Sequence, residues 1–176
     1  ISASGANFRT TNYGDNRMSG NEVGPKDAAG GTQVVASKAI DIAGYLGAGT
    51  YTTAAGDTAK SIATGINALT AKTGVTATAT TEANLGLGAE AYKLDITSNN
   101  STAVTVAFTV SGTASTANDF ASAISVINAA SSKTGVTAEF DATAGGLKLT
   151  NTSGNDITVK NTAAAANTKL NISGYK

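Results

Sequence analysis

The hydrophobic positions of this chain follow two periods, which alternate along the sequence. In two segments the apolar residues recur every three or four positions, the spacing of one helix face. The first stripe consists of Ala59, Ile62, Ala63, Ile66 and Leu69. The second stripe consists of Phe120, Ala123, Ile124, Ile127 and Ala130. The pattern therefore predicts helices over residues 57–73 and 118–133.

Each predicted helix carries signals at both ends. Asp57 is the expected N-cap of the first helix, because its carboxylate can accept hydrogen bonds from the free N–H groups of the first turn. Asp119 has the same expected role in the second helix, with Asn118 as the competing cap. Gly74 and Gly135 follow the helices, where the backbone takes a left-handed conformation to leave the helix.

Between the helices, apolar and polar residues alternate with the period of a half-buried strand. The clearest run is Val104, Val106, Phe108 and Val110. Asn99–Asn100 before it predicts a turn. The Gly-rich residues 82–89 predict an irregular excursion. Further strands are expected at 34–35, 40–42, 75–79, 92–96, 136–140, 147–149 and 157–159.

The chain contains the same segment twice. Residues 57–79 align with residues 118–140 at an offset of 61 (128 − 67), so that Asn67 matches Asn128. The strands that follow match at an offset of 53 (149 − 96), so the first copy has eight extra residues, 82–89. A repeat that keeps its fold-determining residues and carries no reactive ones is typical of a building module.

These patterns together predict an α+β fold that is β-rich overall. We expect two tandem copies of a helix packed on a small antiparallel sheet. The expected division is an irregular Gly-rich segment at 1–33 packed on the body, a first unit at 34–111 and a second unit at 112–176.

Composition excludes several kinds of chemistry. The 176 residues include no Cys and no His, so the chain lacks a thiolate nucleophile, a zinc–sulfur site and the usual acid–base catalyst. Lys plus Arg and Asp plus Glu number 12 each, and no basic cluster suits a nucleic-acid backbone. No apolar run has the length of a membrane span. We expect no catalytic, cofactor-binding or metal-binding residues, no cofactor, and no nucleic-acid or membrane partner.

The polar residues that the repeat preserves have a structural interpretation. Asn67 and Asn128 lie late in their helices, where an Asn side chain bonds nearby backbone and fixes the connection to the next strand. A glycan or ligand site is the alternative. Gly74 and Gly135 end helices instead of starting them, so they do not form a phosphate-binding loop.

The remaining polar groups indicate surface and turns. Asp15, Glu22 and Asp27 are loosely grouped, whereas a calcium site needs several oxygens at tight spacing. Asn155–Asp156 beside Gly154 predicts a hairpin turn. Three matches to the N-glycosylation pattern are expected by chance in a chain so rich in Asn and Thr: Asn100, Asn151 and Asn171.

The repeated pattern resembles the IN motif of bacterial flagellins. It occurs as Ile66–Ala68 with Thr73–Ala77, and again as Ile127–Ala129 with Thr134–Ala138. The filament-cap protein of the flagellum shares this motif. The resemblance covers about residues 50–160 and implies the exposed, hypervariable middle region of a flagellin. The long terminal helices by which flagellins polymerise are missing here, so we expect the chain to be a fragment of a longer protein.

The resemblance implies a structural role without enzymatic activity. The expected function is an outer domain of the extracellular flagellar filament, which serves motility and forms the antigenic surface. Expected partners are neighbouring flagellin subunits, bound through the terminal helices, and antibodies or host surface molecules. The isolated chain is expected to be a monomer.

Two alternatives stay open at this point. One is the middle domain of the filament-cap protein. The other is a carbohydrate-binding or adhesive module of another surface protein, which would stack sugars on exposed aromatic rings. The tyrosines available for this do not cluster in the sequence: Tyr13, Tyr45, Tyr51, Tyr92 and Tyr175.

Overall fold

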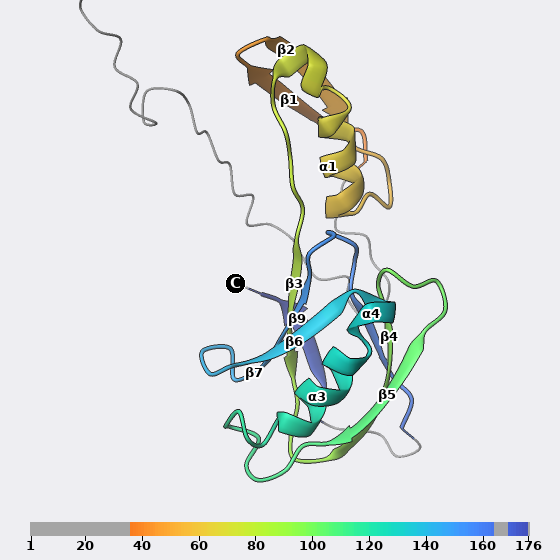
Figure 1. The fold of residues 1–176 in the computed structure, drawn as a ribbon, viewed down its shortest axis with the longest axis vertical. Coiled ribbons are helices and arrows are strands. Elements are labelled where there is room, and N and C mark those ends of the chain that lie inside the picture. The colour runs from red at the N-terminus through yellow and green to blue at the C-terminus, as the bar shows by residue number, and fades with distance from the viewer. Residues whose placement is uncertain (1–35, 164–168, 176) are drawn as a thin grey trace, which may run out of the picture.

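The computed structural model describes residues 36–163 and 169–175 (Figure 1). In these ranges the helices are α1 (Ala59–Asn67), α2 (Thr70–Thr73), α3 (Ala121–Ala129) and α4 (Ser131–Thr134). The strands are β1 (Ala39–Gly44), β2 (Gly47–Thr52), β3 (Thr81–Gly86), β4 (Ala91–Thr97), β5 (Val104–Thr109), β6 (Val136–Asp141), β7 (Gly146–Asn151), β8 (Thr158–Asn161) and β9 (Asn171–Gly174).

The strands form three small antiparallel sheets. Their strand orders are β1–β2, β6–β7–β3–β9 and β5–β4–β8. Figure 1 shows the β1–β2 hairpin with α1 at one end of the molecule and the two larger sheets with α3 at the other. The expected β-rich fold with few helices is therefore present among the described residues.

The main core lies between the two larger sheets and α3. Helix α3 packs on β5 of one sheet and on β6 of the other, so it joins the sheets. Phe120, Ala123 and Ile127 from the helix region have no exposed surface. The Phe120 ring stacks on Phe140 of β6 with centroids 5.5 Å apart. The second apolar stripe is thus the centre of the core.

The period-two pattern correctly predicts most strands around this core. Tyr92, Leu94 and Ile96 of β4 are buried on one face. Val106 and Phe108 of β5 lie beside them on the same face, because Leu94 pairs with Val106 and Tyr92 with Phe108. Strands β6 and β7 bury alternate residues in the same way. Burial of one face at a time is what sequence alternation indicates.

The expected excursion at 82–89 is wrong, because its first part is a strand. β3 lies inside the four-stranded sheet, between β7 and β9. Ala83, Leu85 and Leu87 are buried in the core, and Thr81 is buried as well. These residues do alternate with period two. Glycine and small side chains concealed the pattern.

The strand expected at 75–79 is also wrong in part. Residues 75–80 are not assigned to a strand and lie outside the three sheets. The matching segment of the repeat, β6, does pair with β7. The difference has a simple cause: the chain runs from 80 straight into β3, so no turn after residue 80 brings the following strand back beside 75–80.

Each expected helix is divided into a nine-residue helix and a shorter four-residue one. The first division falls at Ala68–Leu69 and the second at Ala130. The four-residue helices end at Gly74 and Gly135, whose φ angles are 75° and 70°. The predicted left-handed exits are therefore confirmed.

Neither predicted N-cap is correct. Thr58 caps α1, and its hydroxyl and that of Ser61 form a reciprocal capping box. The Asp57 carboxylate instead accepts from Ala54 N and from the hydroxyls of Tyr51 and Ser61. Helix α3 has no side-chain cap, since the residue at that position is the buried Phe120.

Asp119 lies just before α3 and bonds elsewhere. Its carboxylate accepts from Ser115 N and Thr116 N in the preceding loop. Packing of an aromatic ring, rather than a cap, therefore fixes where α3 begins.

The two apolar stripes differ in burial. In the first stripe only Ala63 is buried, while Ile62, Ile66 and Leu69 are half-buried. Helix α1 contacts β2, and the Tyr51 ring lies directly on Gly65. A Cβ at Gly65 would come within 2.1 Å of that ring, so glycine permits this close approach.

The expected division into units stays a prediction. The hairpin β4–β5 precedes the boundary at 111, yet it packs against α3, which follows the boundary. The expectations for residues 1–33 and for Val34–Val35 lie outside the described residues.

A pair of matched substitutions tests the difference in burial between the two apolar stripes. Ile127→Ala should lower the free energy of unfolding by about 2–5 kcal/mol, because it leaves a cavity in a closed core. Ile66→Ala should cost clearly less, since Ile66 is only half-buried. Urea denaturation monitored by circular dichroism measures both. Equal losses would contradict the unequal burial.

Candidate functional site

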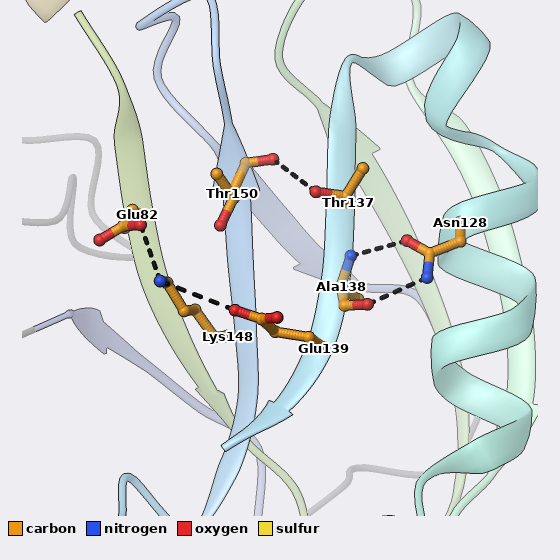
Figure 2. A pocket seen from close by; sticks show the side chains of 7 residues that line it. All are labelled: Glu82, Asn128, Thr137, Ala138, Glu139, Lys148 and Thr150. Carbon is orange, nitrogen blue, oxygen red and sulfur yellow. Dashed lines mark hydrogen bonds and ion pairs between the residues drawn. The ribbon is translucent and has the colours of Figure 1, made fainter.

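The preserved asparagines bind the strand that follows their helix. Asn128 Nδ2 donates to Ala138 O at 3.0 Å, and Ala138 N donates to Asn128 Oδ1 at 2.8 Å (Figure 2). Asn67 makes the same two bonds to Ala77, at 2.9 and 2.7 Å. A carboxamide carries a donor and an acceptor side by side, so it pairs as the peptide group of a strand would. We call this two-bond arrangement the asparagine clasp.

The helix exits also bond in matching ways. The Thr73 hydroxyl donates to Leu69 O and accepts from Val75 N. Thr134 bonds Ala130 O and Val136 N in the same manner, and both threonines are fully buried.

Each helix exit is tied to the hairpin that precedes the helix. Leu46 N donates to Thr73 O at 3.3 Å, and Asn99 N donates to Thr134 O at 3.0 Å. The preserved residues thus hold hairpin, helix and strand together. This supports the structural interpretation of Asn67 and Asn128.

A shallow hollow lies beside the second clasp, on the face of the four-stranded sheet (Figure 2). Its volume is about 440 Å³. It is lined by Glu82, Asn128, Thr137, Ala138, Glu139, Lys148 and Thr150.

Lys148 on β7 lies in the middle of this surface, between the side chains of two neighbouring strands. Its Nζ lies 2.8 Å from Glu82 Oε1 on β3 and 3.7 Å from Glu139 Oε1 on β6. The Tyr175 ring lies beneath the same ammonium, with its centroid 4.6 Å from Nζ. The lysine therefore links three strands electrostatically.

The electrostatics of this surface do not favour acid–base catalysis. The hydrogen bond that Lys148 donates to Glu82 raises the pKa of Lys148, so the amine stays protonated and is not a base. At the sheet edge, the Tyr175 hydroxyl donates to Asp141. This bond, followed by those from Ala144 N and Thr143 N, lowers the pKa of the Asp141 carboxyl. At neutral pH Lys148 therefore stays positively charged and Asp141 stays negatively charged, as they would be in water.

The tyrosines do not form a sugar-binding platform in the described part of the chain. Tyr92 is buried, and its hydroxyl bonds Gly88. Tyr51 bonds Asp57 beside α1, whereas the Tyr175 ring contacts Lys148 on the four-stranded sheet. Tyr45 is 85% exposed at the tip of the β1–β2 hairpin. Tyr13 lies outside the described residues.

Residues 36–163 and 169–175 contain no group of three acidic, His or Cys side chains that could hold a metal ion. Asp15, Glu22 and Asp27 lie outside these ranges. Nor do the described helices include one long and apolar enough to cross a membrane.

The asparagines of the matched glycosylation patterns are partly engaged in structure. The Asn100 carboxamide bonds Ile96 O and Thr102 O and so closes the predicted turn. Asn151 is fully buried and bonds Ser98 Oγ and Asn99 Oδ1. Asn155 also donates to Asn99. This polar cluster, which joins the β4–β5 turn to the end of β7, gave no signal in the sequence.

The described residues thus define a β-rich building module. Residues 39–91 match the family model described as flagellin hook IN motif. The match spans β1 to β3 with the first clasp, and it supports a flagellin-type structural protein. No curated protein matches the chain significantly. The second occurrence of the pattern, at 127–138, lies beyond the matched range.

The clasp can be tested by removing each carboxamide. Asn128→Ala should cost about 1–3 kcal/mol of unfolding free energy, because it leaves two main-chain groups of Ala138 without partners. Amide exchange at Ala138 should accelerate. Asn67→Ala should accelerate exchange at Ala77 with a smaller loss of stability, since water reaches this exposed site. Ser125→Ala, on the exposed side of α3, is the control. Unchanged exchange at Ala138 would disprove the role of the clasp.

The carboxyl of Asp141 gives a prediction about pH. Its pKa is lowered in the folded protein, so its contribution to stability is present above the unfolded value of about 3.9 and is lost as pH falls through the folded value. Tyr175→Phe removes the main cause and should raise the pKa of Asp141. An NMR titration of the carboxyl carbon measures this, with Tyr45→Phe as control. The same pKa in both variants would refute the assignment.

Proposed function

We propose that this chain is a surface-exposed outer domain of a bacterial flagellar filament subunit, built from two IN-type units. The match to the flagellin IN motif at 39–91 carries the proposal. The second unit is supported by the clasp of Asn128, which repeats that of Asn67 at the same offset of 61 residues. In this role the domain serves motility and forms the antigenic surface of an extracellular filament.

The bonding of the described residues supports a structural rather than enzymatic role. The charges on the sheet face are paired across strands, and the preserved side chains bond the backbone. Among the described helices the longest has nine residues, too short for the polymerising helices of a flagellin. In our proposal, contacts between neighbouring subunits are made by helices elsewhere in the parent protein.

The exposed hairpin tip supports a role at the filament surface. Tyr45 and Leu46 are 85% and 55% exposed between β1 and β2. Such protruding loops are where recognition by other molecules concentrates. Antibodies and host surface molecules are therefore the proposed partners of this face.

Deleting the segment from the parent gene tests the proposal. Because residues 1–176 are placed outside the filament core, cells should still assemble filaments, which should be thinner and no longer bind an antiserum raised against this chain. Electron microscopy and immunoblotting measure both. Loss of filaments in cells that still export the truncated subunit would contradict a peripheral domain.

Immunogold labelling separates the filament from the cap. Antiserum against the chain should label wild-type filaments along their length. Labelling confined to the tip would identify the filament-cap protein instead. Binding of the purified chain to a glycan array, without labelling of flagella, would favour the carbohydrate-binding module.

A further inference from the structure

Residues 75–80 form an extended segment with one bonded edge and one open edge. The clasp of Asn67 occupies the N–H and C=O of Ala77, and Thr70 Oγ1 donates to Val75 O at 2.7 Å. Successive residues of an extended chain point their main-chain groups to opposite sides. Those of Thr76, Thr78 and Thr80 therefore face away from α1. Figure 1 shows no described strand drawn alongside this segment.

The second copy of the repeat shows what such an edge accepts. There the clasp of Asn128 occupies Ala138 on the inner edge. The outer edge pairs with β7, so that Thr137 lies opposite Thr150 and Glu139 opposite Lys148. The offset of 61 relates Thr76 to Thr137 and Thr78 to Glu139. A clasped strand in this protein thus takes an antiparallel neighbour on its free edge.

The first copy lacks the features that normally protect an edge strand. Its sequence from 75 to 80 is Val-Thr-Ala-Thr-Ala-Thr, without a charge, a proline or a glycine. Thr76, Thr78 and Thr80 are exposed, and Val75, Ala77 and Ala79 are half-buried. Charged side chains, prolines and bulges are the usual protection against edge pairing. An extended, uncharged edge is instead a template for another strand.

We propose that residues 75–80 pair antiparallel with the same segment of a second copy of this chain. The segment is self-complementary: with Thr78 opposite Thr78 of the second copy, Thr76 lies opposite Thr80. All outward N–H and C=O groups then find partners, which gives about six hydrogen bonds, two for each pair. Threonines opposite one another also contact favourably on a sheet face. The net charge of zero adds no general repulsion between copies.

This pairing is weak between free copies, because the shared edge is only six residues long. It gains strength where copies are held close together, since neighbours in an assembly have effective concentrations of about 1 mM. A monomer at micromolar concentration agrees with the proposal. The inference stands on hydrogen bonding alone and does not depend on the proposed function.

Sedimentation of the full 176-residue chain up to about 1 mM tests the proposal. The weight-average mass of the wild type should rise towards twice the monomer mass. Thr78→Pro should keep the chain monomeric, because it removes an outward N–H that the pairing needs. The variant should still fold, since proline fits an extended edge and leaves the Asn67 clasp intact. Thr78→Val keeps the N–H and should associate like the wild type. Circular dichroism checks that both variants fold.

Crosslinking gives a second reading of the same geometry. The chain has no cysteine, so Thr78→Cys introduces a single thiol at the two-fold axis, where directly opposite Cβ atoms are about 5 Å apart. Its disulfide-linked dimer should form many times faster than that of Ser122→Cys, at an exposed position of α3.

Several results would overturn the inference. One is a wild type that stays monomeric up to about 1 mM, and another is equal crosslinking of the two cysteine variants. Association that persists in Thr78→Pro would place the contact on another surface. Slow amide exchange at Thr76 and Thr78 in a monomer would show that another part of the same chain fills the edge.

Discussion

The fold depends on how an asparagine side chain substitutes for a strand. The Asn128 carboxamide bonds both main-chain groups of Ala138, so the strand after the helix must run alongside the helix. The left-handed Gly135 provides the reversal that makes this course possible. With its inner edge closed, β6 can extend its sheet only towards β7. A local bond thereby decides on which side the four-stranded sheet grows.

The sequence predicts well those features that depend on residues close together along the chain. The left-handed exit at Gly135, the alternation of β5 and the bonding of Asn128 to nearby backbone all follow from local chemistry. β3 was missed because its place in the sheet depends on pairing Leu85 with Leu147 and Ile172, far away in the sequence. The N-caps failed for a related reason, since the buried Phe120 fixes the start of α3 through tertiary packing.

The charged surface could not be predicted either. Lys148 on β7 contacts Glu139 across the β6–β7 hairpin and Glu82 on the neighbouring strand β3, and the second contact requires a strand that the pattern did not reveal. The absence of Cys and His from the sequence did limit the chemistry in advance. Composition thus shows which side chains are available, whereas the partners of each charge required the register of the sheet.

The segments that follow the two clasps explain why the part of the molecule around α3 is well buried and the part around α1 is not. Helix α3 packs between β5 and β6, and β7 extends the sheet behind it. Helix α1 covers a two-stranded hairpin, which is marginal by itself in water, and among the described residues no strand pairs with the extended segment 75–80. The β1–β2 hairpin relies on the Tyr51 ring over Gly65 and on the bond from Leu46 N to Thr73 O. The segment that follows α3 is therefore paired by its own chain with β7, whereas none of the described strands pairs with the segment that follows α2.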